Sequence, residues 1–503
     1  MMRLTFATTA VLAVFAAPVA WADLTAEEVW KDWQSNFTSF GYTYSANEER
    51  TGDQLILTDL IVSSATPEND GSSQITLDRI VLTEQSDGSV SVSLPEVSPF
   101  EMTSDTEAGG RATVNMNIVQ DALRITATGT PANLNYDYTA KSMAIVSTRI
   151  EMDGQVLPAE TNSFEARFEE MSGASNVLLD TMRRNTQSLQ VAEFQYSFNL
   201  GEPDSSDQAD VSGGAANLQF SGSSATPLEV VQADNMAEML DAGFSVDGTF
   251  TFQDGRSQIT AVGDDDRFAG AFTSTSGDLK VTMGEKGLTY GVTQNGLNAQ
   301  IASDSIPVPV EFSVETAGLN LQMPLRQSDQ ARDFGLGLQL NGFAMSDILW
   351  GLFDPAAQLP RDPATIIADV SGKGRLLFDF LDPEAASLSG NPNITPAEVE
   401  TLDINQLQIS VAGAELKGTG AFRFDNSAGG AQRPVGGVDL MLAGGNTLLD
   451  RLVAIGIVPQ EQATGVRMMM GLLAVPGDAP DTLNSRIEIN DQGHISANGQ
   501  RIQ

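Results

Sequence analysis

Three consecutive aspartates, Asp264, Asp265 and Asp266, form the densest group of metal-type ligands in this 503-residue sequence. Carboxylate oxygens suit calcium, but calcium loops alternate their ligands with other residues and turn at a glycine. The glycine-rich nonapeptides of calcium-binding β-rolls are also absent. The three aspartates are therefore the metal candidates of the sequence, but their pattern favours a charged hairpin loop, and we expect no cofactor.

Nucleophilic and acid–base catalysis has few residues to use. The chain has no cysteine and one histidine, His494, which follows a turn sequence at 491–493. No serine stands in a G-x-S-x-G or S-x-x-K motif, and the Gly-Lys-Gly sequence at 372–374 lacks the other residues of a phosphate-binding loop. The sequence therefore nominates no catalytic or cofactor-binding residue. Hydrolysis by a pair of carboxylates stays open, because sequence alone selects no pair among 66 acidic residues.

The charge and the lack of cysteine exclude several classes of partner and site. A formal net charge of −39 should repel nucleic acid and anionic surfaces, so we expect no nucleic-acid partner. Without cysteine there is no disulfide, no thiolate metal site and no thiol for lipid attachment. A chain of this length can still bury adequate cores, in two or more domains.

The N-terminal segment has the three parts of an export signal. Arg3 carries its only charge, an apolar run follows over residues 4–17, and Ala20 and Ala22 form a small-x-small cleavage site that would leave Asp23 at the new N-terminus. The apolar run is shorter than the ~20 residues that cross a bilayer, and no later run approaches that length. We expect a periplasmic protein with no transmembrane helix in the mature chain, with extracellular release as the alternative.

The periodicity of apolar residues predicts a mainly β fold with helices (α+β), built on long curved antiparallel sheets with packing helices at the start, middle and C-terminus. Thr25-x-x-Glu28 is a capping box that opens an amphipathic helix, which a Gly-Tyr step at 41–42 ends. Further helices are expected at 164–185, 235–242, 346–354, 447–456 and 461–474. Between them, residues alternate with period two, as in strands.

The domain organisation is expected to be a signal peptide over 1–22, a helix with an antiparallel β domain over 23–225, and a second β-rich domain over 226–503. A Ser-, Gly- and Asp-rich stretch at 201–224 suggests a linker or hairpin loops. The helix at 235–242 is followed by Gly243-Phe244, as the first helix is by Gly41-Tyr42. This echo suggests two related halves.

Four segments carry a resemblance to a known family. They are the Trp30–Tyr42 segment, the two short sequences Leu349-Trp350-Gly351-Leu352-Phe353-Asp354-Pro355 and Leu359-Pro360-Arg361-Asp362-Pro363-Ala364-Thr365, and Asn498-Gly499-Gln500-Arg501. Together they resemble domain of unknown function 2125, an uncharacterised family of exported alphaproteobacterial proteins. The resemblance implies no activity, cofactor or catalytic residue. More distantly, the strand-rich pattern is similar to that of AsmA-like envelope proteins, which is a fold-level analogy alone.

Three functions compete at this point. We favour a non-enzymatic periplasmic envelope protein whose sheet has one apolar face and holds a lipid or other hydrophobic partner in a groove. An outer-membrane β-barrel would share the signal and the alternation, but the chain has only four tryptophans and six tyrosines for two aromatic girdles. A secreted hydrolase that uses carboxylates alone is the third. The oligomeric state is left open.

The export signal makes the first testable prediction. Protein isolated from the envelope of its native cells should have Asp23 as its N-terminus, because cleavage follows the small residues Ala20 and Ala22. Intact-mass measurement checks this. A mass that still includes residues 1–22 would contradict it.

Overall fold

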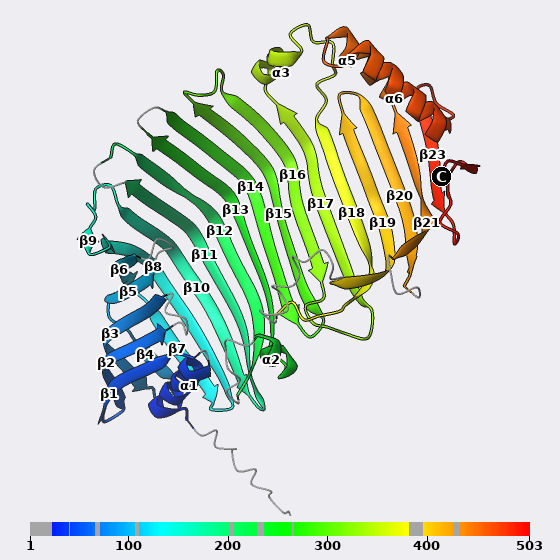
Figure 1. The fold of residues 1–503 in the computed structure, drawn as a ribbon. Helices are drawn as coiled ribbons and strands as arrows, with labels where there is room; N and C mark the ends of the chain where they lie inside the picture. The colour runs from blue at the N-terminus through cyan, green and yellow to red at the C-terminus, as the bar shows by residue number, and fades with distance from the viewer. Residues whose placement is uncertain are drawn as a thin grey trace, which may run out of the picture.

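The computed structural model describes residues 23–39, 41–65, 71–105, 110–201, 205–228, 236–263, 266–381, 396–426 and 432–503. Within these ranges the chain forms a single 25-stranded sheet, in which every pairing is antiparallel, and five helices (Figure 1). The prediction of a mainly β fold with helices at the start, middle and C-terminus is confirmed.

The strands follow one another across the sheet in nearly the order of the sequence. The first nine are β1 Thr43–Thr51, β2 Gln54–Ala65, β3 Gly71–Glu84, β4 Val90–Ser93, β5 Val97–Asp105, β6 Arg111–Asp121, β7 Arg124–Thr130, β8 Asn133–Met152 and β9 Gln155–Val156. The central strands are β10 Ser163–Leu179, β11 Met182–Gly201, β12 Gln208–Pro227, β13 Ser245–Val262, β14 Arg267–Gly284, β15 Gly287–Ser303, β16 Val310–Met323 and β17 Arg332–Met345. The last are β18 Ala364–Leu376, β19 Ala397–Val411, β20 Ala414–Asp425, β21 Arg433–Ala443, β22 Val475–Pro476, β23 Thr482–Ile489, β24 Ile495–Ala497 and β25 Gln500–Arg501.

Two positions in this order are each filled by a pair of shorter strands. β4 and β5 both pair with β3, and β6 and β7 both pair with β8. The register on β8 is the same for both partners, because Asp121 lies opposite Ser142 and Arg124 lies opposite Thr139. β6 and β7 are therefore one long strand interrupted at residues 122–123.

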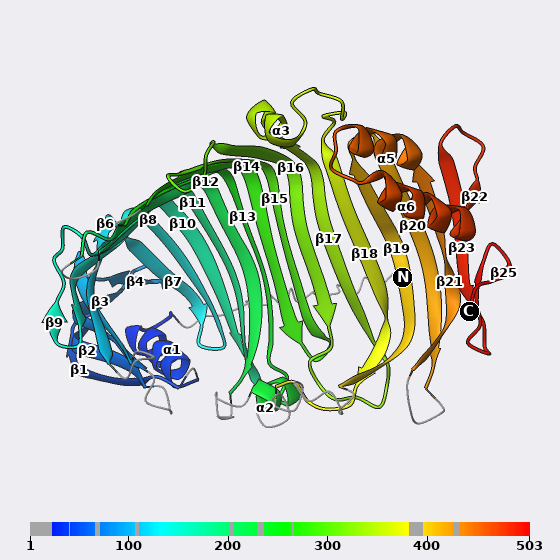
Figure 2. The same cartoon turned by 45° about the horizontal axis from the view of Figure 1, so that its top comes forward.

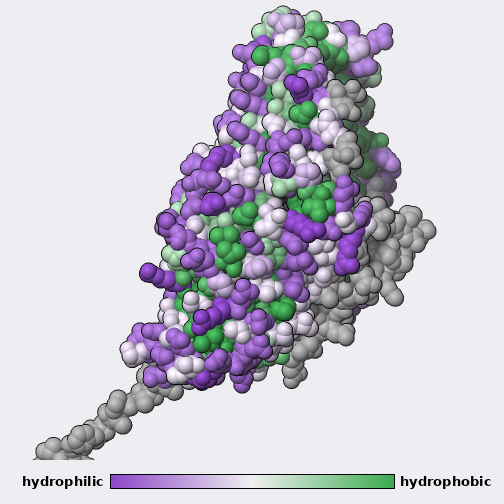
Figure 3. Space-filling view, turned by 90° about the vertical axis from the view of Figure 1, so that its left-hand side faces the viewer, coloured by the Kyte–Doolittle hydropathy of each residue, from purple (hydrophilic) through white to green (hydrophobic). Residues whose placement is uncertain are grey.

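At its N-terminal end the sheet curls around helix α1, Ala26–Ser39 (Figure 2). Val29 and Trp30 of this helix are buried against the inside of the curl, where the largest apolar core lies. Trp30 also packs edge-on to Tyr44 of β1, with 5.8 Å between ring centroids. The predicted amphipathic helix therefore packs on the sheet through its aromatic side. The outside of the curl shows hydrophilic residues interspersed with separate hydrophobic ones (Figure 3).

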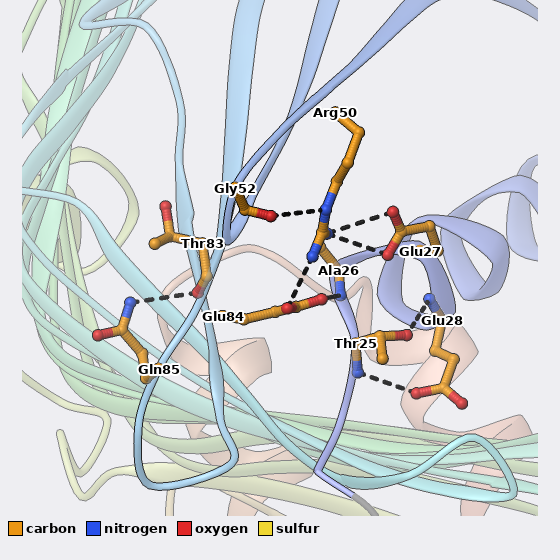
Figure 4. A network of polar contacts seen from close by, with 9 residues as sticks. All are labelled: Thr25, Ala26, Glu27, Glu28, Arg50, Gly52, Thr83, Glu84 and Gln85. Carbon is orange, nitrogen blue, oxygen red and sulfur yellow. Dashed lines mark hydrogen bonds and ion pairs between the residues drawn. The ribbon is translucent and has the colours of Figure 1, made fainter.

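The start of α1 is held by the predicted capping box and by an ion-pair network (Figure 4). The backbone N–H of Glu28 donates to the hydroxyl of Thr25, and the N–H of Thr25 donates to the Glu28 carboxylate. Arg50 of β1 bridges Glu27 of the helix and Glu84 of β3. The hydrogen bond from Arg50 lowers the pKa of Glu84, since it favours the charged carboxylate.

A buried charged group ties the middle of α1 to a distant strand. Arg183 of β11 donates to both carboxylate oxygens of Asp32, at 2.5 and 3.2 Å, and the hydroxyl of Tyr136 donates to the same carboxylate at 2.7 Å. Asp32 and Arg183 are 5% and 6% exposed, so solvent screens this pair little. Burial raises the pKa of Tyr136, and the negative charge of Asp32 adds to the rise. Helix α1 is thereby held against strands β8 and β11, which lie more than a hundred residues further along the chain.

The other helices lie along the ends of the strands. α2, Met236–Asp241, precedes β13, and α3, Asp347–Phe353, follows β17. α5, Gly445–Ala454, and α6, Gln460–Leu473, follow β21. All four agree with the predicted positions. No helix within the described ranges is both long and apolar enough to cross a membrane.

The ends of α1 and α2 share one hydrogen-bond pattern. Gly41 and Gly243 both have positive φ, at 76° and 95°. The N–H of the aromatic residue after each glycine donates to a carbonyl five residues back, from Tyr42 to Phe37 and from Phe244 to Met239. This is the Schellman ending of a helix. The glycine–aromatic pair that follows both helices in the sequence therefore has the same local geometry at both places.

The helix predicted at 164–185 is wrong. Residues 163–179 form β10, which pairs with β8 and β11 along its length. The segment has apolar residues at Phe164, Phe168 and Met171, a spacing of four and three that imitates a helix. That spacing has a cause within the sheet, described below.

The linker or hairpin loops suggested for 201–224 are wrong for residues 208–215 and 222–224, whereas the strand expected at 216–221 is confirmed. These residues belong to β12, a strand of 20 residues between β11 and β13. The domain boundary expected near residue 225 lies at the end of β12. Because β12 is paired with β13 over most of its length, the sheet is continuous across that position.

Removing one partner of the buried ion pair should destabilise the fold strongly. Arg183→Met leaves the Asp32 carboxylate charged and unpaired in the core, which costs about 3–5 kcal/mol of unfolding free energy. Arg184→Met is the matched control, because Arg184 pairs with Asp180 with both side chains nearly half exposed and should cost less than about 1 kcal/mol. Urea unfolding measures both. Equal losses in the two variants would contradict the role given to Asp32 and Arg183.

Candidate functional site: the apolar face of the sheet

Residues directly opposite each other on antiparallel strands lie on the same face of a sheet, so the register defines its two faces. One row of such residues crosses eight strands and is almost wholly apolar: Phe250, Leu279, Val292, Leu319, Leu338, Ala368, Leu407 and Gly418. The adjacent row on the other face is mostly polar: Thr251, Asp278, Thr293, Gly318, Gln339, Ile367, Gln408 and Lys417. The sheet therefore has an apolar face and a polar face.

The apolar face is continuous with the side that covers α1. Phe250 lies opposite Phe220, which lies opposite Leu189, and this row continues to Gly173 and Tyr138. One unbroken face thus runs from the core around α1 to the C-terminal strands.

The alternation of side chains is inverted once along several of the long strands, and β2 shows how. Leu55 and Leu57 lie in the core around α1, and so do Leu60 and Val62. A regular strand would place residues 57 and 60 on opposite faces. Asp59 between them has φ 53°, a left-handed conformation that turns the following residues over. The apolar residues therefore follow the spacing two, three, two.

The same inversion explains why the apolar spacing in residues 164–171 resembles that of a helix although the segment is strand β10. Phe168 and Met171 of β10 pack in one apolar cluster, with Glu170 between them at φ 50°. In the neighbouring strands, Phe194 and Val191 of β11 belong to this cluster too, again three residues apart. The spacing of three is thus a property of the sheet at this position.

The inversion points lie side by side across the sheet, and we call their row the inversion line. Residue 192 lies between Glu170 and Asn217, since the pairs on either side are in register on both strands. From there the line continues to Asp254 and then through residue 275 to Gly296. Its residues with positive φ are Asp59 (53°), Ala122 (54°), Glu170 (50°), Asn217 (51°), Asp254 (49°), Gly296 (61°) and Gly342 (66°).

A pocket of about 270 Å³ opens on the apolar face at the inversion line. Four phenylalanines from three strands line it, Phe194 of β11, Phe250 and Phe252 of β13 and Phe272 of β14, together with Ala215 and Leu218. The polar side chains of Ser274 and Gln294 reach the same pocket. Its composition of aromatic walls with a few polar groups is typical of sites for small apolar ligands.

The apolar face is covered at one end and open in the middle. Around α1, Leu57, Leu60 and Ile80 are completely buried. On β17 and β18, by contrast, Leu338 and Ile366 of the same face are each 46% exposed. No element among the described residues covers them. A half-exposed apolar patch in the middle of a continuous face is the strongest functional feature of the part of the chain that the structure describes.

The residues singled out in the sequence are placed as follows. Asp264, Asp265, Ala20 and Ala22 lie outside the described residues, whereas Asp266 is described. Burial alone would raise the pKa of Asp266, but hydrogen bonds from Ser303 and Ser305 lower it overall.

Asp23, the expected mature N-terminus, is exposed, just ahead of the residues that begin α1. His494 lies at the terminal hairpin turn, where its backbone N–H donates to the side-chain oxygen of Asn490 at 3.0 Å. Within the described ranges no three His, Cys, Asp or Glu side chains are grouped as metal ligands would be. The apolar face was expected from the alternation, whereas the pocket and the inversion line were not, because both depend on register between distant strands.

The fold and this face define a class, namely an open single-sheet β protein with one apolar face that a few helices cover only in part. A bacterial family described as "Uncharacterized protein conserved in bacteria (DUF2125)" matches residues 246–497, half of the chain, and the chain belongs to this family. The match includes α3 and the proline-rich segment after it, while Trp30–Tyr42 lies outside it. No curated protein sequence matches the chain.

The inversion line predicts where glycine is required. Gly342 has φ 66°, and a Cβ built on it would come within 2.4 Å of the Glu315 side chain. Gly342→Ala should therefore lower the unfolding free energy by about 1–2 kcal/mol. Gly337 of the same strand has ordinary backbone geometry and room for a Cβ 3.5 Å from Asn320, so Gly337→Ala is the control. If both variants melt like the parent protein in urea, the left-handed position is not required.

Proposed function

We propose that this protein is a non-enzymatic, exported envelope protein that holds a lipid or another hydrophobic partner against the apolar face of its sheet. The observation that carries the proposal is the half-exposed apolar patch on β17, β18 and β19. Leu336, Leu338, Ile366 and Ile409 expose 38–46% of their surface on that face. Soluble proteins seldom leave a contiguous apolar area of this kind open unless something binds there.

The energetics suit an extended apolar ligand. Covering the exposed half of one leucine or isoleucine contributes roughly 1 kcal/mol, so a chain that lies along several of them gains several kcal/mol. The row across β13 to β20 contains no charged side chain, so a ligand that lies along this row desolvates no ionic group there. Arg256, which also lines the pocket, is paired with Glu193. The pocket of phenylalanines at the inversion line would take one end of an acyl chain.

The cellular location in this proposal rests on the sequence of residues 1–22. The charged start, the apolar run and the small residues before Asp23 support export. We place the protein in the periplasm, where lipids must cross an aqueous space, with extracellular release as the alternative.

The test compares two charge insertions on neighbouring residues of β17. Leu338→Glu places a carboxylate on the apolar face, and Gln339→Glu places one on the polar face. Protein purified from native envelopes is extracted with organic solvent, and its lipids are quantified by mass spectrometry. We expect near-stoichiometric lipid in the parent chain and in Gln339→Glu, and at least about a ten-fold loss in Leu338→Glu.

Negligible lipid in the parent protein would overturn the proposal. So would equal lipid in Leu338→Glu and Gln339→Glu, because the apolar face would then not be where the lipid lies. Circular dichroism and thermal melting of both variants show that the sheet is intact.

A further inference from the structure

A second apolar surface, which we call the helical rim, lies beyond the ends of the strands; the apolar face itself, with its pocket, is called the groove. The helical rim consists of the outward residues of α3 and α6: Ile348, Leu352, Phe353, Met468, Met469 and Leu472. Met468 is 72% exposed, Leu352 59% and Leu472 52%. These helices lie beyond the same ends of the strands, with α5 beside them (Figures 1 and 2).

The rim is fixed to the fold by its inward side. Trp350 of α3 packs in one cluster with Leu359, Ala412 and, from α5, Leu448 and Leu452. α6 is held by an ion pair between Arg467 and Asp450 of α5, at 2.5 Å. The outward apolar side chains are therefore presented on a packed support.

The rim is continuous with the apolar face. Met345, the last residue of β17, packs in the cluster around Trp350. It lies opposite Phe312 on β16, and Phe312 contacts Phe343 with 5.8 Å between ring centroids. Apolar side chains thus connect the groove with the base of the helical rim.

The charge of the rim differs from that of the rest of the chain. Residues 445–475 contain two acidic and two basic residues, although the whole chain has 66 acidic and 27 basic ones. In α3 the only charged residue, Asp347, is paired with Arg361. A surface that is apolar and locally neutral can approach a bilayer that would repel the remainder of this acidic protein.

From the exposure, the neutrality and the continuity with the groove, we infer that the helical rim docks on the surface of a lipid bilayer. Met468, Met469 and Leu472 insert among the headgroups, together with Ile348 and Leu352. The inference rests on the proposed function, since docking at this edge brings the end of the apolar groove to the lipids. The occupant is the bilayer itself and not a protein.

The test is flotation with vesicles of phosphatidylethanolamine and phosphatidylglycerol at a 3:1 ratio. About one lipid in four is then anionic, as in a bacterial membrane surface. The double variant Met468→Glu/Leu472→Glu adds charge to exposed positions, and Gln462→Glu, also exposed on α6, is the control. We expect the parent chain and Gln462→Glu to float with the vesicles. The double variant should lose more than about ten-fold in partitioning.

Absence of flotation in the parent chain, or flotation that the double substitution does not change, would overturn the inference. Dimerisation without vesicles that the double variant abolishes would overturn it as well, because the rim would then bind a second copy. Lipid extraction from the same double variant separates the two proposals. If the double variant keeps its lipid but no longer floats, both proposals are supported. If the parent chain floats but carries no lipid, only the proposal that the apolar face binds lipid is refuted.

Discussion

An extended strand offers its side chains only two directions, and this molecule depends on keeping its apolar side chains on one of them across the whole width of a very large sheet. A single layer has no second sheet to bury a misplaced leucine. The register of neighbouring strands must therefore be correct at every pairing, because a slip of one residue exchanges the two faces. Here the row from Phe250 to Leu407 shows that it is.

The inversion line is the exception that this constraint has to accommodate. Positive φ costs little at Gly296 and Gly342 and is tolerated at Asn217 and Asp254, because short polar side chains also adopt left-handed geometry. Ala122 and Glu170 are less favourable there. The chain nevertheless keeps the line at both positions, since otherwise the apolar residues on one side of it would face solvent. The aromatic pocket at Phe194 and Phe252 lies on this line.

Local signals in the sequence predicted local structure well. The capping box at Thr25, the glycine endings at Gly41 and Gly243 and the helix over 346–354 all agree with the structure, because each is decided by residues a few positions apart.

The strand at 163–179 was mistaken for a helix because the inversion at Glu170 placed Phe168 and Met171 three residues apart. A linker or loops were predicted for residues 208–215 because Ser, Gly and Asp are common in turns, but these residues lie within β12. The buried pair of Asp32 and Arg183 could not be predicted, since 151 positions separate them. The exposure of Leu338, on which the proposed function depends, is likewise a property of the folded surface alone.

The most direct test of the account is photo-crosslinking from the apolar face in living cells. A photoreactive phenylalanine analogue placed at residue 338 points into the groove, and the same group at 339 points to the polar face. We predict lipid adducts, identified by mass spectrometry, from position 338 and not from position 339. Equal adducts from the two positions, or none from position 338, would contradict the claim that this face holds a hydrophobic ligand.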